Sequence, residues 1–217
     1  MPTPKERLSH LLELAAKGKE QRAALADEVA GLLLGWPQQY SPAMRASFEA
    51  LLEKIAREVD VAGRRKLAER FVRAGDASLS LLNELFLAAP ETMKRDILRR
   101  NDAHAIGSVT GIDGSALLVA ARARRNFAAD LAHLAAIPRC IAEEILDDHS
   151  CLALAVVAKG GGLPRPFFSA IAILTIASPD DVASLSQFES VPTNGAANLL
   201  AFWRAKLDAS LASRDAA

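Results

Sequence analysis

Apolar residues recur at helical spacing along most of this chain. From Phe48 to Val59 they are spaced three, one, three and four positions apart, as in a helix with one face toward a core. The next stretch repeats the pattern with Leu67, Ala68 and Phe71. No segment alternates strictly between apolar and polar residues, which is the pattern of a half-buried strand. The sequence therefore predicts an all-α protein, in which Phe48, Leu51, Leu52, Ile55, Val59, Leu67, Ala68, Phe71 and Val72 face the core.

Capping and helix-breaking residues divide the chain into about 11 to 13 short helices. Ser41 before Pro42 and Asp60 before the next apolar stripe are typical N-caps. Gly35 and Pro90 mark further breaks. We expect helices at residues 4–16, before 35, 42–59, 61–74, 78–88, 91–100, 116–126 and 127–136, in the 137–174 segment, after 178 and from 193, with a frayed tail at 209–217.

The segment from Ile137 to Leu174 is the most regular unit of the chain. It predicts a short amphipathic helix, a tight turn, a more apolar helix, a glycine break and a third helix that begins at a proline. Within it, Cys151–Ala158 is the most apolar run, and we expect it to be the most buried element. Lys159-Gly160-Gly161-Gly162 lacks the spacing of a phosphate-binding loop and follows a helix instead of a strand. We therefore interpret it as a helix end and a turn.

Composition narrows the class of protein. Hydrophobic residues make up 51% of the chain and aromatic residues only 5%, with Ala and Leu, two strong helix formers, abundant. The two cysteines predict no disulfide framework. No run reaches the roughly 18 to 20 apolar residues that cross a bilayer, and the N-terminus lacks the apolar stretch of a secretory signal. We expect a cytoplasmic protein that does not enter a membrane.

The net charge is zero, but the middle of the chain is basic. Residues 61–126 carry 12 basic and 7 acidic groups, whereas residues 127–217 carry 6 and 10. This uneven distribution of charge is informative about binding partners and solubility, and not about the fold. The arginines that we expect to contact a partner are Arg64, Arg65, Arg95, Arg99, Arg122, Arg124 and Arg125. A protein partner is favoured over nucleic acid, because acids interrupt the basic stretch and the phenylalanines within it occupy core-like positions.

The residues that could take part in catalysis or bind a metal do not form a recognisable catalytic or metal-binding pattern. Cys140, His149 and Cys151 are of types that bind zinc, but they lack ligand spacing and a fourth ligand. The acidic pairs and the separate histidines show no nucleophile–base arrangement; they are Glu143, Glu144, Asp147, Asp148, His10, His104 and His133. We predict a protein that is not an enzyme, with no catalytic residues, no metal, no cofactor and no small-molecule ligand.

The turn and helix from Asp60 to Ala68, with Arg65 three residues before Ala68, resemble the second-helix signature of HEAT repeats. Together with the unit from Ile137 to Phe168, the run from Arg64 to Phe71 is similar to an alphaproteobacterial HEAT-like helical-repeat domain family of unknown function. The resemblance covers about residues 40–180, and the second unit departs from it with Ala155 in place of the arginine.

The resemblance implies an α–α superhelix of HEAT-like, armadillo-type helix pairs without catalytic residues. The expected organisation is a single helical-repeat domain over 1–217, with capping helices at 1–40, a core at 41–187 and a capping helix and tail at 190–217. The expected function is that of a bacterial protein-interaction scaffold or adaptor, and the alternative is binding of the DNA backbone by the basic helices.

Overall fold

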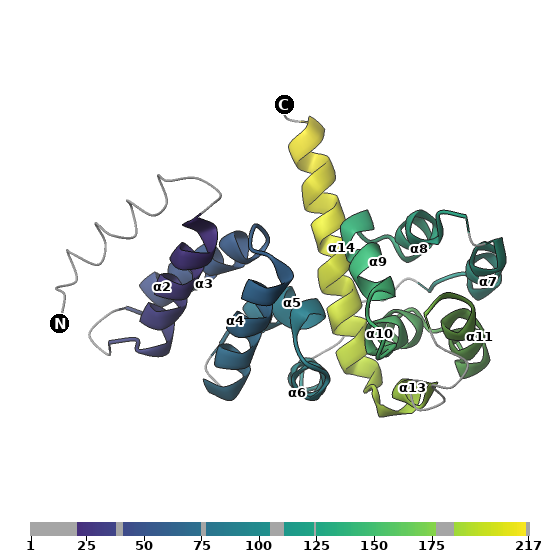
Figure 1. Ribbon diagram of the computed structural model, residues 1–217, viewed down its shortest axis with the longest axis horizontal. Helices are drawn as coiled ribbons and strands as arrows, with labels where there is room; N and C mark the ends of the chain where they lie inside the picture. Colours follow the sequence, from purple (N-terminus) through teal and green to yellow (C-terminus); the bar gives the residue numbers. More distant parts are fainter. Residues whose placement is uncertain are drawn as a thin grey trace. The chain divides into compact units, whose positions relative to one another are not determined.

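The computed structural model describes residues 21–37, 41–74, 77–104, 111–123, 125–176 and 185–215 (Figure 1). These residues form twelve α-helices, one short 3₁₀ helix and no strand, so the predicted all-α class is confirmed. The helices predicted at residues 4–16 and directly after 178 lie outside the described residues. Within the described part of the chain, no helix is both long and apolar enough to cross a bilayer.

The chain groups into two compact units, Met1–Met93 and Lys94–Ala217. Each has its own buried apolar residues, and each is described separately below. We call them unit 1 and unit 2.

Unit 1 consists of two stacked helix hairpins. Its helices are α2 (Arg22–Leu34), α3 (Pro42–Ala56), α4 (Val61–Ala74) and α5 (Leu79–Leu85), followed by the 3₁₀ helix η2 (Phe86–Ala88). Helix α2 pairs with α3 and α4 with α5, while α2 also packs on α4 and α3 on α5 (Figure 1). The two hairpins therefore lie side by side in two layers, with α2 and α4 in one layer and α3 and α5 in the other.

Side-chain caps set where the helices of unit 1 begin. The Ser41 Oγ accepts a hydrogen bond from the Met44 backbone N–H at 3.2 Å, and the Ser78 Oγ accepts one from the Leu81 N–H at 3.3 Å. The Asp60 carboxylate accepts from the Gly63 N–H at 2.7 Å. Each cap satisfies a donor that the first helical turn leaves unpaired. The helix starts predicted at Ser41 and Asp60 are confirmed.

The core of unit 1 contains most, but not all, of the predicted residues. Leu52, Ile55, Val59, Leu67, Ala68 and Phe71 are buried as expected, whereas Val72 is only partly buried. The prediction for Leu51 is wrong, since 40% of this residue is exposed. Phe48 is half-buried and packs edge-on against Trp36, with ring centroids 5.9 Å apart.

The buried face of α3 includes Glu49, Leu52 and Ala56, and Leu51 lies outside it. The Glu49 carboxylate lies 3.1 Å from the Arg45 guanidinium, which makes its burial tolerable. The periodicity of apolar residues missed the burial of Glu49 because it assigned every acidic residue to the solvent.

Unit 2 contains most of α6 (Glu91–Asp102), and then α7 (Gly114–Ala123), α8 (Phe127–Ala135), α9 (Arg139–Leu146), α10 (Leu152–Gly160), α11 (Arg165–Thr175), α13 (Gln187–Ser190) and α14 (Thr193–Asp215). Helix α10 contacts α9, α11, α13 and α14 (Figure 1). Every residue of Cys151–Ala158 is buried, so the prediction that this run is the most buried element is confirmed. The helix–turn–helix–glycine–helix order predicted for the 137–174 segment is also confirmed.

The last helix is longer than predicted. Helix α14 extends to Asp215, so residues 209–215 of the tail predicted to fray are helical, and residues 216–217 lie outside the described residues. Alanine, leucine and arginine in this tail are strong helix formers, and no glycine or proline interrupts them. Trp203, on the same helix, is 1% exposed.

The three glycines after Lys159 end α10 and let it approach α14. A Cβ atom on Gly160 would lie 2.7 Å from the Ala196 carbonyl oxygen, so only glycine fits this helix crossing without a shift. Gly161 is the C-cap, and Gly162 has a φ of 73°, in the left-handed region. The interpretation of this run as a helix end and turn is confirmed.

Candidate binding groove

The predicted partner-binding arginines are distributed over both units. Arg64 and Arg65 lie on α4 of unit 1, while Arg95 and Arg99 lie on α6 and Arg122 on α7 of unit 2. Arg125 follows α7, and Arg124 lies outside the described residues.

Three of these arginines already have partners within their own unit. The Arg65 guanidinium lies 3.5 Å from the Glu69 carboxylate, and that of Arg99 lies 2.8 Å from Asp96. The Arg95 Nη2 donates a hydrogen bond to the Gln187 side chain at 3.1 Å. Arg122 and Arg125 are exposed and form no ion pair with other described residues. The predicted arginines therefore belong to helices of both units, and Arg65, Arg95 and Arg99 each contact a neighbour within their own unit.

A different basic cluster lines an open groove in unit 1. The groove lies along α2 and α4, which run side by side in Figure 1, and has a volume of about 630 Å³. We call it the α2–α4 groove, and it is lined by Asp27, Leu34, Lys66, Glu69, Arg70, Arg73 and Ala74.

The α4 side of the groove carries three cations on one helix face. Lys66, Arg70 and Arg73 are four and three residues apart, the spacing that places side chains in one row. The Arg70 Nη1 donates to the Asp27 carboxylate at 3.1 Å and so connects the two walls. Lys66 and Arg73 are exposed and have no ion pair among the described residues. Glu69 also lines the groove, with its carboxylate 3.5 Å from the Arg65 guanidinium, so Lys66 and Arg73 are the two groove cations without an ion pair among the described residues.

The α2 side of the groove consists of the Asp27 carboxylate and Leu34, and Gly31 lies between them in the sequence of the helix. Gly31 is exposed, and a Cβ atom placed on it would meet only the end of the Arg70 side chain, at 3.7 Å. Leu34 is 36% exposed and supplies an apolar surface at the C-terminal end of α2. At Gly31 itself α2 contributes no side chain, and the end of the Arg70 side chain is the nearest group.

The sequence contained the signal for this groove. Lys66, Arg70 and Arg73 lie in the basic stretch, and their helical spacing separates them from the buried stripe of Leu67 and Phe71. Arg64 and Arg65, the α4 residues predicted to contact a partner, do not belong to this row. Which helix would form the opposite wall was not accessible from periodicity.

Unit 1 also contains a cluster of carboxylates between α3 and α5. Burial raises the pKa of Glu53 above its ordinary value, a hydrogen bond with Ser80 opposes the shift, and the nearby Glu84 carboxylate adds to it. The Glu84 side chain is 5% exposed and lies 3.2 Å from the Arg57 guanidinium. Because arginines compensate part of its charge, this cluster is explained as part of the packing of α3 on α5.

Among the acidic residues of the 137–174 segment, Asp148 has a structural role. The buried Asp148 carboxylate lies 3.0 Å from the Lys94 ammonium and accepts hydrogen bonds from the Ser150 hydroxyl and the Ala153 N–H. Asp148 thereby fixes the turn that begins α10.

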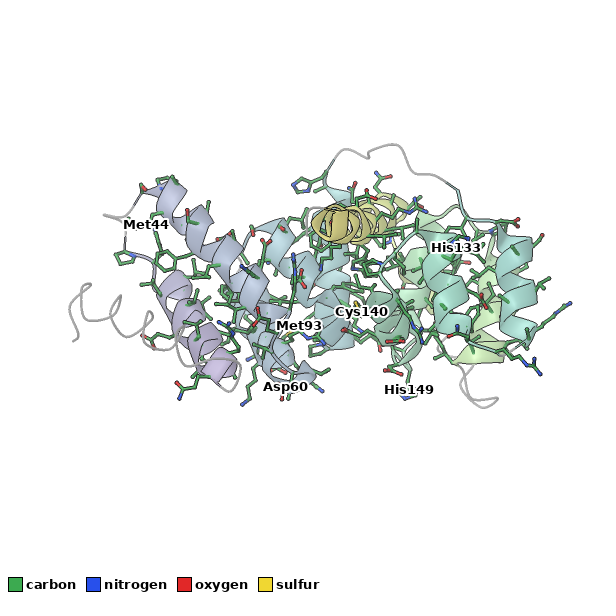
Figure 2. The ribbon with its side chains drawn as sticks, turned by 90° about the horizontal axis from the view of Figure 1, so that it is seen from above. Met44, Asp60, Met93, His133, Cys140 and His149 are labelled. Carbon is green, nitrogen blue, oxygen red and sulfur yellow. The ribbon has the colours of Figure 1, made fainter. Side chains whose placement is uncertain are left out.

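Cys140 is exposed and Cys151 is buried, and Figure 2 shows Cys140, His133 and His149 at separate places. Over the described ranges, no group of three or more His, Cys, Asp or Glu residues is arranged to hold a metal ion.

Comparison of the chain with models of known protein families, with curated proteins and with solved structures finds no match. The site must therefore be interpreted from its own geometry.

Proposed function

We propose that the protein is a non-catalytic scaffold of the cytoplasm that binds another protein through the α2–α4 groove. In this proposal the stacked hairpins of unit 1 are a HEAT-like repeat pair, and helices of one layer together form a binding face. The stacking of α2 on α4 and of α3 on α5 supports this interpretation. The proposed function rests on the groove and not on an analogy of fold alone.

The observation that carries the proposal is the α2–α4 groove itself. Its walls combine the apolar Leu34 and the Asp27 carboxylate of α2 with a row of cations on α4, and the α2 residue between them is Gly31. An apolar surface bordered by charged residues is typical of protein-binding sites. The residues that line the groove include no histidine, serine or cysteine, and its two carboxylates, Asp27 and Glu69, are paired with Arg70 and Arg65.

The test compares proteins retained from a cell lysate by the full chain and by Gly31→Phe. A phenylalanine at this position fills the groove without changing charge, and position 31 accepts a side chain because its surroundings are open. Lys54→Glu serves as the control, since Lys54 is exposed on α3, outside the groove.

We expect a protein that the wild type and Lys54→Glu retain and that Gly31→Phe loses. If every retained protein binds all three variants equally, the groove is not the binding site and the proposed function is wrong.

The second candidate function is binding of nucleic acid by unit 2. It is favoured by Arg122 and Arg125, which are exposed near the end of α7 without ion pairs among the described residues. This candidate predicts duplex DNA binding at about 50 mM salt that falls steeply as salt rises and is lost in Arg122→Ala/Arg125→Ala. Absence of a shifted band at low salt would eliminate it.

A further inference from the structure

The chemistry of the α2–α4 groove restricts what it can bind. We propose that it binds an acidic amphipathic helix of a partner protein. Two carboxylates of that helix would form ion pairs with Lys66 and Arg73, and a small residue between them would pack against Gly31. This inference rests on the proposed function and specifies the partner.

The shape of the groove fits one face of a helix. The α2 wall exposes Gly31, around which nothing but the Arg70 side chain lies within contact distance of an added Cβ atom. Small residues at a helix interface let two backbones approach closely, and a helix bound in a groove can pack against such a surface. Leu34 lies at the end of the wall and can contact an apolar residue of the bound helix.

The charges of the groove set the spacing of the partner's acids. Lys66 and Arg73 are seven residues apart on α4, which corresponds to about 10.5 Å along a helix axis. Two carboxylates seven residues apart on a partner helix have the same spacing. Between them, Arg70 is already paired with Asp27 at 3.1 Å, so the partner's central position should be neutral and small.

The acids of the groove argue against a continuous polyanion. Asp27 and Glu69 both line it, and a nucleic-acid backbone would bring phosphates next to these carboxylates. A helix with separated acidic residues avoids them, because its neutral positions face Asp27 and Glu69. The groove therefore favours an acidic helix over DNA or RNA.

The probe for the test is a labelled helical peptide of about 20 residues, long enough to be partly helical alone. It carries Glu at two positions seven apart with Ala between them, in the pattern Glu-x-x-Ala-x-x-x-Glu, and a Leu on the same face. Three comparison peptides have Lys in place of both Glu residues, Phe in place of the central Ala, or the same composition in scrambled order. Binding to the full-length protein is measured by fluorescence anisotropy.

We expect the Glu peptide to bind the wild type and to bind Lys66→Glu/Arg73→Glu about 10-fold more weakly, the combined effect of two exposed charge pairs lost and replaced by repulsion. The matched control Lys54→Glu/Arg125→Glu makes the same change of charge at two exposed residues outside the groove, and it should bind like the wild type. The Lys peptide should bind the reversed variant better than the wild type, which a misfolded variant would not do. The Phe peptide and the Gly31→Phe variant should each lose binding.

Any one of three results would overturn the inference. The wild type does not bind the Glu peptide, it binds the scrambled peptide as tightly as the Glu peptide, or duplex DNA displaces the labelled Glu peptide as effectively as unlabelled Glu peptide does. If the lysate experiment finds a partner that depends on the groove but the Glu peptide fails, only the chemistry assigned to the partner is wrong. If both experiments fail, the proposed function fails as well.

Discussion

At the residue scale, the charged groups that the structure buries are held by specific partners. Lys94 and Asp148 form an ion pair at 3.0 Å in which both side chains are nearly inaccessible to solvent. Their pairing joins α6 to the turn before α10 and cannot be derived from periodicity, because the two residues lie far apart in the sequence. An acid in a polar stretch such as Asp147-Asp148 predicts exposure, and only the fold distinguishes the buried one.

Replacing Lys94 with alanine should destabilise unit 2 by about 3 to 5 kcal/mol, because the Asp148 carboxylate would remain buried without its cation. Urea unfolding followed by circular dichroism measures the change. Lys54→Ala, which removes an exposed lysine, should change stability by no more than about 0.5 kcal/mol. A loss below about 1 kcal/mol in Lys94→Ala would show that the pair is not essential to packing.

Glu53 predicts how the stability of unit 1 depends on pH. Burial, with the adjacent Glu84, raises its pKa in the folded state, so the folded protein holds this proton more tightly than the unfolded chain. The resulting stabilisation is fully present below the unfolded pKa and is lost as pH rises through the folded pKa.

Accordingly, Glu53→Gln should be more stable than the wild type at pH 7 and should lose less stability between pH 5 and pH 7. Thermal unfolding at a series of pH values measures both effects. Parallel stability curves for the two proteins would contradict the expected role of Glu53.

At the element scale, the sequence predicted where helices begin better than which of their faces are buried. Ser41, Ser78 and Asp60 cap the helices that follow them because capping depends on residues within one turn. The exposure of Leu51 and the length of α14 differed from prediction. Which face of a helix is buried depends on the helices that pack against it, and the residue pattern within one helix does not specify those neighbours.

Two helical glycines should respond in opposite ways to alanine. Gly31→Ala should stabilise unit 1 by about 0.5 to 1 kcal/mol, since position 31 has open space and an ordinary helical backbone. Gly160→Ala should destabilise unit 2 by about 1 to 3 kcal/mol, because the new Cβ would press on the Ala196 backbone. Chemical unfolding of both variants measures the two changes in the free energy of unfolding. If both variants are more stable than the wild type, α10 and α14 leave room for a Cβ atom at Gly160.

At the scale of the whole molecule, the chain consists of two compact units whose cores are built differently. In unit 1 two hairpins share a layered core, whereas in unit 2 the buried α10 contacts α9, α11, α13 and α14. The sequence indicated helix pairs along the whole chain and expected one domain, because short helices with similar stripes look alike in a pattern. Partition into units depends on contacts between distant segments.

A fragment of residues 90–217 should fold without the rest of the chain. The cut before Pro90 leaves α6 intact and keeps Lys94 with Asp148. Since this part has its own core, we expect a helical circular dichroism spectrum and a cooperative thermal transition. A fragment that melts gradually, or is largely unfolded at 25 °C, would show that its core depends on residues 1–89.

The position of the two tryptophans gives the protein an intrinsic pair of optical reporters. Trp36, half-buried beside Phe48, belongs to unit 1, and the almost inaccessible Trp203 belongs to unit 2. Because indole emission shifts to longer wavelengths in water, Trp36→Phe leaves a blue-emitting reporter in one unit and Trp203→Phe leaves a redder one in the other. Denaturant titrations of these two variants would reveal whether the units melt together or in sequence, without any attached dye.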